Sequence, residues 1–109
     1  MSFHESCELI RIEVRDDGTW LLAAAGTVNE GEHIPAELRL DDRIGNSDGW
    51  FAYPGENFSE TAHEIEIDFR EDGPWLTAVL AEQDQEDRER QGINLAQHIG
   101  NNNGELVWV

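Results

Sequence analysis

Hydrophobic and polar residues alternate in two stretches of the chain that are related by a constant shift of 55 positions, as from Ile10 to Ile65. In residues 10–15 apolar side chains at every second position are separated by charged ones, and residues 65–70 repeat this pattern. A period of two places alternate side chains on opposite faces of an extended strand. Both stretches are therefore predicted to be half-buried β-strands.

A turn signal and a second apolar run follow each predicted strand. Asp17-Gly18 leads into Trp20-Leu21-Leu22, and Asp72-Gly73 leads into Trp75-Leu76-Thr77. Asp-Gly between apolar runs is typical of a tight β-hairpin. Because Trp20 and Trp75 occupy equivalent positions, we expect both to be core anchors.

The remainder of each repeat is predicted to hold two more strands. Residues 27–35 and 82–91 are polar and are expected to be loops or hairpin tips, since residues 82–91 lack the apolar face of a stable helix. Leu38 and Leu40, like Ile93 and Leu95, indicate a third strand. An Ile-Gly-Asn-x-x-Gly turn follows and leads into a last apolar run.

The same shift superimposes most of the chain on itself without gaps, which indicates a tandem duplication. The pairs include Phe3 with Phe58, Asp17-Gly18 with Asp72-Gly73, Leu40 with Leu95, and Ile44-Gly45-Asn46 with Ile99-Gly100-Asn101. The repeats span residues 3–54 and 58–109. Units of this length bury too little surface to fold alone, so a single domain over residues 1–109 with strands exchanged between repeats is expected.

Charge and cysteine content narrow the functional classes. The chain has 24 Asp and Glu against 7 Lys and Arg, a formal net charge of -17 and a pI near 4.2. Such a surface repels nucleic acid and anionic lipid, so neither a nucleic acid nor a membrane partner is expected. The single cysteine, Cys7, has no intramolecular partner, and no secretory signal pattern opens the chain, so a cytoplasmic location is expected.

The residues alone leave the chemistry open. His4, His33, His63 and His98 are scattered without metal-ligand spacing, so no metal and no cofactor is expected. Carboxylates abound, but nothing in the pattern ties two of them to opposite sides of one cleft, so an enzyme is not expected. The two Asn-x-x-Gly segments are first of all turns, because Asn and Gly tolerate positive φ.

Four motifs and the duplication together resemble the cyanovirin-N homologue family of mannose-binding lectins, over essentially the whole chain. The motifs are Phe3-x-x-Ser6, Leu38-x-Leu40-x-x-x-Ile44-x-Asn46-x-Asp48-Gly49, Asn57-Phe58-x-Glu60-Thr61, and Ile93-Asn94-Leu95-x-x-x-Ile99-x-Asn101-x-x-Gly104.

The resemblance implies an all-β fold of two pseudo-symmetric halves, each a three-stranded antiparallel sheet plus a β-hairpin, with strands exchanged between repeats. The terminal half would comprise residues 1–42 with 97–109, and the central half residues 43–96. One shallow site at each end would bind terminal α1-2-linked mannose of high-mannose glycans, without metal and without catalysis. The implied partners are oligomannose glycans or glycoproteins.

Position by position, the resemblance also implies the site residues. In the central half they are Gly45, Asn46, Asp48, Glu56, Asn57, Thr61, Glu82, Gln83 and Gln85. In the terminal half they are Ser2, Glu5, Ser6, Gly26, Thr27, Asn101, Asn102 and Asn103, with Val28 beside them. Amides, carboxylates and turn backbone groups suit the neighbouring hydroxyls of a pyranose.

Departures from the family pattern bear on stability and site strength. Family members with two disulfides staple each half, but Ala25 stands opposite Cys7, and Ala62 and Leu80 occupy the second pair. Stability must then come from apolar packing. The terminal half has fewer long polar side chains, with Ser2, Val28 and Asn103 in place of Asn57, Gln83 and Asp48, so the central site is expected to be the stronger.

Two alternatives stay open. One is an interaction or scaffold domain that kept the fold and lost sugar binding, which the strong acidity favours. The other concerns assembly: a monomer is expected, but Pro54-Gly55 forms a short hinge between the repeats and is compatible with a strand-swapped dimer.

Overall fold

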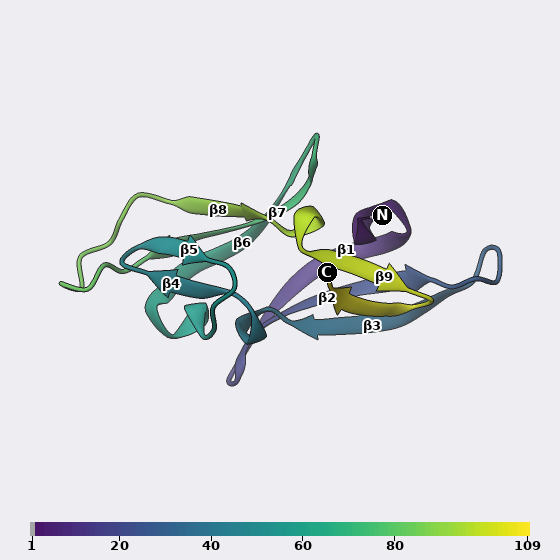
Figure 1. The fold of residues 1–109 in the computed structure, drawn as a ribbon, viewed down its shortest axis with the longest axis horizontal. Coiled ribbons are helices and arrows are strands. Elements are labelled where there is room, and N and C mark those ends of the chain that lie inside the picture. Colours follow the sequence, from purple (N-terminus) through teal and green to yellow (C-terminus); the bar gives the residue numbers. More distant parts are fainter. Residues whose placement is uncertain (1) are drawn as a thin grey trace.

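The computed structural model describes residues 2–109 as an elongated all-β body measuring 50 × 29 × 21 Å (Figure 1). Two three-stranded antiparallel sheets lie side by side along its length. The first has the order β1-β2-β3 and consists of β1 (Cys7–Arg15), β2 (Gly18–Gly26) and β3 (His33–Arg39). The second has the order β6-β7-β8 and consists of β6 (Ala62–Arg70), β7 (Gly73–Leu80) and β8 (Gln91–Asn94).

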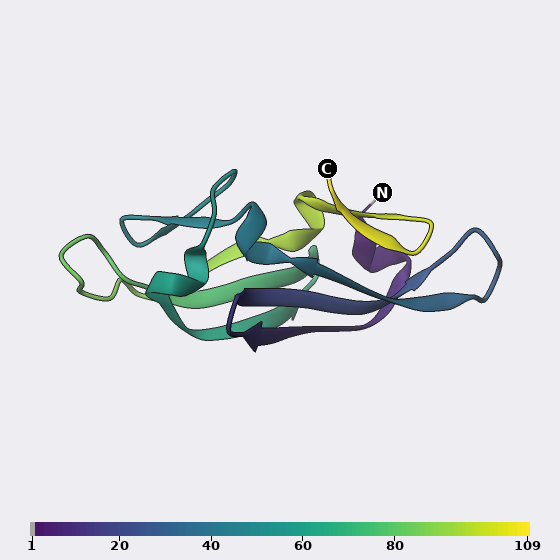
Figure 2. The same ribbon diagram turned by 90° about the horizontal axis from the view of Figure 1, so that it is seen from below.

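Two short hairpins cover these sheets and are exchanged between the repeats (Figure 2). The hairpin of β4 (Gly45–Ser47) and β5 (Trp50–Ala52) belongs to the first repeat but lies against β8 of the second. The hairpin of β9 (Ile99–Asn102) and β10 (Glu105–Trp108) belongs to the second repeat but lies against β3 of the first. The predicted fold class, including the strand exchange, is confirmed.

Four 3-10 helices turn the chain between these elements: η1 (Phe3–Glu5), η2 (Leu40–Asp42), η3 (Phe58–Thr61) and η4 (Leu95–Gln97). Leu40 and Leu95, which the alternation assigned to strands, begin η2 and η4 and are fully buried. The strand cannot continue there, because the chain must turn to deliver its hairpin to the other repeat. Among residues 2–109 no helix is long and apolar enough to cross a membrane.

The core is built from equivalent residues of the two repeats. Fully buried pairs are Phe3 with Phe58, Leu21 with Leu76, Leu40 with Leu95, and Ile44 with Ile99. At the two positions where the resemblance implies disulfides, Cys7 faces Ala25 and Ala62 faces Leu80 across neighbouring strands. Ala25 and Leu80 are fully buried, so apolar packing fills both places. Burial also raises the pKa of the Cys7 thiol.

Trp20 and Trp75, predicted as core anchors, lie half-buried at the sheet surface instead. Each indole N–H donates to the aspartate of the preceding turn, Asp17 at 3.0 Å and Asp72 at 2.8 Å. The guanidinium of Arg15 covers Trp20 at 4.9 Å, and that of Arg70 covers Trp75 at 4.4 Å. A fully buried indole would need a polar partner inside the core, whereas here its N–H meets a carboxylate at the surface.

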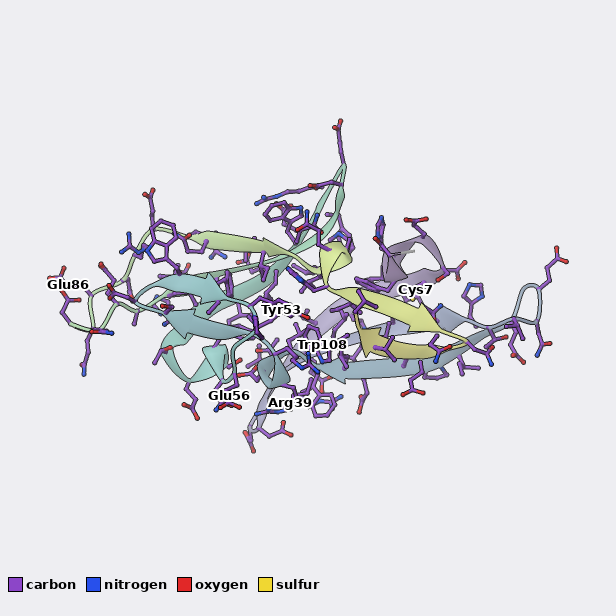
Figure 3. All side chains as sticks on the ribbon, in the orientation of Figure 1. Cys7, Arg39, Tyr53, Glu56, Glu86 and Trp108 are labelled. Carbon is purple, nitrogen blue, oxygen red and sulfur yellow. The ribbon has the colours of Figure 1, made fainter. Side chains whose placement is uncertain are left out.

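At the junction of the two halves, Tyr53 stacks on His98 with ring centroids 3.9 Å apart and lies 5.9 Å from the ring of Trp108 (Figure 3). Burial lowers the pKa of His98, which favours the neutral form of this imidazole. These three rings join Tyr53, which follows the β4-β5 hairpin of the first repeat, to the β9-β10 hairpin of the second.

A buried carboxylate marks where the repeats have diverged. Asp41, only 1% exposed, accepts hydrogen bonds from the Thr19 amide at 2.9 Å, the Ser59 amide at 3.0 Å and the Ser59 hydroxyl at 2.8 Å. It therefore ties β2, η2 and η3 together. The equivalent residues of the other half are Ala96, Pro74 and His4, which cannot form this network.

We expect Asp41→Ala to lower the free energy of unfolding by about 2–4 kcal/mol, since the amides of Thr19 and Ser59 would lose their buried acceptor. Urea unfolding measures the effect. The matched control is Asp42→Ala, because the Asp42 side chain is 58% exposed and bonds only at the surface. Its effect should stay within about 0.5 kcal/mol. Equal losses in the two variants would contradict a special role for Asp41.

Candidate functional site

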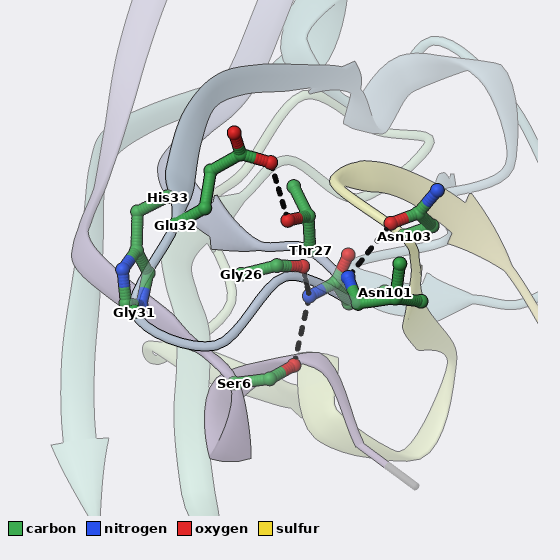
Figure 4. A pocket seen from close by; sticks show the side chains of 9 residues that line it. Ser6, Gly26, Thr27, Gly31, Glu32, His33, Asn101 and Asn103 are labelled. Atoms are coloured by element: carbon green, nitrogen blue, oxygen red, sulfur yellow. Dashed lines mark hydrogen bonds between the residues drawn. The ribbon is translucent and has the colours of Figure 1, made fainter.

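Two open pockets lie at the hairpin tips, one at each end of the molecule. The central pocket encloses about 660 Å³ and is lined by Asn46, Ser47, Asp48, Glu60, Thr61, Ala81, Glu82, Gln83 and Gln85. The terminal pocket encloses about 350 Å³ and is lined by Ser6, Gly26, Thr27, Val28, Gly31, Glu32, His33, Asn101 and Asn103 (Figure 4). Asn46 and Asn101 are equivalent in the repeat, so the two pockets share one plan.

The shared plan is an asparagine whose side chain bonds the hairpin to the opposite sheet. The Asn46 amide nitrogen donates to Thr61 Oγ1 at 2.8 Å and to the Ala81 carbonyl at 2.9 Å, and Asn46 Oδ1 accepts from the Gly49 amide at 2.8 Å. Both N–H donors of the side chain are thereby used. Asn46 builds the pocket wall and has no donor left for a ligand.

Asn101 repeats these contacts in the terminal half (Figure 4). Its amide nitrogen donates to Ser6 Oγ at 2.8 Å and to the Gly26 carbonyl at 2.9 Å, and its Oδ1 accepts from the Gly104 amide at 2.9 Å. The two networks match to within 0.1 Å in every corresponding distance. The duplication has therefore preserved the framework of both pockets.

A second contact holds each hairpin tip against the neighbouring loop. Asp48 (φ 50°) and Gly49 (φ 89°) form a two-residue turn with positive φ at both positions, as in a type I′ hairpin. Asp48 Oδ1 accepts from the Gln83 amide at 2.9 Å, and Asn103 Oδ1 accepts from the Val28 amide at 2.8 Å. Asp48 lines the central pocket, and within residues 2–109 no hydrogen bond uses its Oδ2.

The loops beside the two pockets differ in what they present. In the terminal loop, Glu32 accepts hydrogen bonds from the Thr27 hydroxyl at 2.5 Å and from the side-chain Nδ2 of Asn29 at 3.2 Å, and these bonds lower the pKa of its carboxyl group. Glu32 is thus engaged by its own loop. In the central loop Glu82, Gln83 and Gln85 all line the pocket.

Arg88 braces the central pocket from outside. Its guanidinium carbon lies 4.3 Å from the centre of the Trp50 ring, and Nη2 donates to the Asp48 carbonyl and to Glu82 Oε1, each at 3.4 Å. The equivalent residue of the terminal half is His33, whose Nε2 lies 3.8 Å from Glu8. This brace is present in one half only.

Of the residues that the sequence assigned to the central site, Asn46, Asp48, Thr61, Glu82, Gln83 and Gln85 line the pocket, whereas Gly45, Glu56 and Asn57 do not. Gly45 forms a bridge with Asn57 behind the hairpin, and a Cβ at Gly45 would lie 2.8 Å from the Glu56 amide nitrogen. Asn57 lines a separate pocket at the repeat junction instead, beside Asp41 and Arg39.

Of the residues assigned to the terminal site, Ser6, Gly26, Thr27, Asn101 and Asn103 line the pocket, with Val28 beside them, whereas Ser2, Glu5 and Asn102 do not. Asn102 follows Asn101 at the end of β9, where its side chain is exposed to solvent. Glu5 is the last residue of η1, and the next residue, Ser6, lines the pocket in its place.

Sequence reasoning missed Ser47 and Glu60 in the central pocket and Gly31, Glu32 and His33 in the terminal pocket. It also missed the Arg88 brace. The duplication carries a signal for Arg88. The shift of 55 positions that pairs Asn46 with Asn101 also pairs Arg88 with His33, which lines the terminal pocket. Among residues 2–109 no group of three or more His, Cys, Asp or Glu side chains is placed to hold a metal ion.

Comparison with known proteins agrees with this architecture. The family model described as the CVNH domain matches residues 3–107. The chain belongs to the CVNH family.

Three similar proteins show how far the likeness extends. The cyanovirin-N homologue of Neurospora crassa is 42% identical over 109 residues, covering 97% of this chain and 96% of its own. The solution structure of the Gibberella zeae CVNH protein is 39% identical with a TM-score of 0.81, covering 97% of this chain and 95% of its own. The structure of microvirin in complex with mannobiose is 32% identical with a TM-score of 0.81, covering 99% of this chain and 98% of its own.

The CVNH framework makes a matched test possible. We expect Asn46→Ala to destabilise the protein by about 1–3 kcal/mol, because the Gly49 amide loses its acceptor and the hairpin loses its bonds to the opposite sheet. The amide resonances of Gly49 and residues 81–83 should shift in ¹H-¹⁵N spectra, while those of the terminal pocket stay in place.

Asn101→Ala is the matched control in the other half. It should shift the amide resonances of Gly104 and residues 26–28 and leave those of the central pocket in place. Spectral changes spread over both pockets in either variant would contradict the independence of the two networks.

Proposed function

We propose that this CVNH protein is a lectin that binds terminal α1-2-linked mannose of high-mannose glycans, without metal and without catalysis. The observation that carries the proposal is the pair of equivalent pockets whose walls are held by the Asn46 and Asn101 networks. The likeness to microvirin, solved with mannobiose, supports mannose as the sugar.

The free groups of the central pocket suit a neutral sugar. Thr61 Oγ1 accepts a hydrogen bond from Asn46, so its hydroxyl proton is available to donate. Asp48 Oδ2 and the carboxylate of Glu60 offer acceptors, and the amides of Gln83 and Gln85 offer both donors and acceptors. Neighbouring hydroxyls of a pyranose donate and accept in turn, so such a mixed and rigid set matches them.

The hydrogen bonds that two of the three carboxylates in the central pocket already accept support binding without hydrolysis. Asp48 accepts from the Gln83 amide, and Glu82 is held by Arg88. Glycoside hydrolysis commonly requires two carboxyl groups that flank the scissile bond and are free to exchange protons or attack the sugar. In the central pocket only Glu60 is without such a partner among residues 2–109.

We further propose that the central site is the stronger of the two. Its pocket is the larger and presents Gln83 where the terminal pocket presents Val28, an apolar side chain that is 82% exposed. Gln83 can bond a sugar hydroxyl, whereas Val28 cannot. If both sites bind, their placement at opposite ends allows one protein to bridge branched glycans and gain avidity.

Titration of ¹⁵N-labelled protein with α1-2-mannobiose tests this proposal. Amides around Asp48 and Gln83 should shift at lower sugar concentrations than those around Val28 and Asn103, and a metal chelator should change neither response. A chito-oligosaccharide serves as the control for sugar identity.

Asp48→Ala and Asn103→Ala form a matched pair for the same titration. Each removes the side chain that fixes its loop, so each should weaken its own site about tenfold or more, equivalent to about 1.4 kcal/mol, and leave the other site unchanged. Absence of any mannobiose-induced shift in the unaltered protein would contradict the lectin proposal.

The acidity favours a second candidate, an interaction domain that has lost sugar binding. A net charge of -17 attracts basic proteins over several ångströms of solvent. In this case a glycan array would stay blank, and a basic protein would be captured at low salt and released at high salt.

A further inference from the structure

Trp50 presents an exposed indole at the rim of the central pocket. It is 51% exposed and pairs with Ser47 across the β4-β5 hairpin, and Ser47 lines the pocket. Residues directly opposite each other in an antiparallel pair project from the same face of the hairpin. Trp50 therefore shares a face of the hairpin with one residue of the pocket lining, Ser47, and directly follows the turn that carries another, Asp48.

Arg88 holds this indole in place. The guanidinium covers one face of the ring at 4.3 Å, while its Nη2 bonds to the Asp48 carbonyl and the pocket residue Glu82. Pocket, arginine and tryptophan thus form one continuous series of contacts. Within residues 2–109 no second aromatic ring stacks on Trp50, and about half of its surface is exposed, at 51%.

Trp50 differs from the two other tryptophans that lie under arginines. Trp20 and Trp75 are half-buried, and their indole N–H groups are bonded to Asp17 and Asp72. In the described residues the Trp50 indole N–H donates no hydrogen bond. Trp50 therefore keeps both an apolar surface and a donor for a ligand.

The fold does not require this arrangement. The β9-β10 hairpin forms the same two-residue turn with Glu105 at the position of Trp50 and His33 at the position of Arg88. An exposed aromatic residue that the equivalent turn does without has no evident structural role, so a binding role accounts for it better.

We propose that Trp50, braced by Arg88, is an outer subsite that packs against the pyranose ring next to the sugar held in the central pocket. The inference rests on the proposed lectin function. A pyranose has an apolar face of C–H groups, which suits a flat aromatic surface, and hydroxyls at its edge that can accept from the indole N–H. Because Arg88 already holds the ring, little side-chain entropy is lost on binding.

The test compares α1-2-mannobiose with the linear α1-2-linked mannotriose, using the central-pocket amides to follow binding. In the unaltered protein the trisaccharide should bind the central site roughly fivefold more tightly than the disaccharide, as expected for one aromatic contact. Trp50→Ala should abolish this gain and leave the affinity for the disaccharide within about twofold.

Glu105→Ala is the matched control, because Glu105 is the equivalent residue of the terminal half. This variant should still bind the trisaccharide more tightly than the disaccharide at the central site. The Gly49 and Gln83 amides report whether Trp50→Ala leaves the pocket folded.

Equal affinities of the unaltered protein for the two sugars would overturn the outer subsite while leaving the lectin function intact. An equal loss for both sugars in Trp50→Ala would also overturn it, because Trp50 would then support the pocket itself. Failure of the unaltered protein to bind either sugar would remove the lectin proposal and this inference together.

Discussion

The side-chain amides of Asn46 and Asn101 join each hairpin to a sheet of the other repeat, and the rest of the structure depends on this contact. Asn46 reaches Thr61 and Ala81, and Asn101 reaches Ser6 and Gly26. Neither repeat can satisfy its asparagine alone, because the carbonyl and hydroxyl acceptors lie in the other repeat. The same bonds that make the strand exchange specific therefore shape the wall of each pocket.

On this symmetric frame the two halves have acquired different chemistry. The first repeat contributes Asp41, which organises the junction with Ser59, while the equivalent alanine and histidine cannot. The central end has gained the Arg88 brace and Trp50, where the terminal end has His33 and Glu105. Within the asparagine networks the equivalent partners differ only in ways that keep the bonding group, a hydroxyl in Thr61 and Ser6 and a main-chain carbonyl in Ala81 and Gly26, so the exchange stays intact.

The scarcity of basic residues gives the arginines a particular place in the structure. Three of the seven, Arg15, Arg70 and Arg88, lie over tryptophan rings. Arg15 and Arg70 also bond carboxylates of their own strands, and Arg88 bonds Glu82. Each guanidinium therefore offsets local acidic repulsion while covering apolar surface. The central pocket keeps Asp48, Glu60 and Glu82 in its wall, which favours neutral over anionic sugars.

The sequence by itself determined the duplication, the first two strands of each repeat, the Asp48-Gly49 turn and the family. These features follow from periodicity and turn chemistry, which act over a few residues, and from motifs whose spacing survives in the chain. Only the tertiary structure decided which polar side chains reach the pockets. Asn57 turned to the repeat junction, and the donors of Asn46 were used inside the protein, because both outcomes depend on partners far away in sequence. Arg88 meets Asp48 across 40 positions for the same reason, since local patterns carry no information about contacts that only the strand exchange creates.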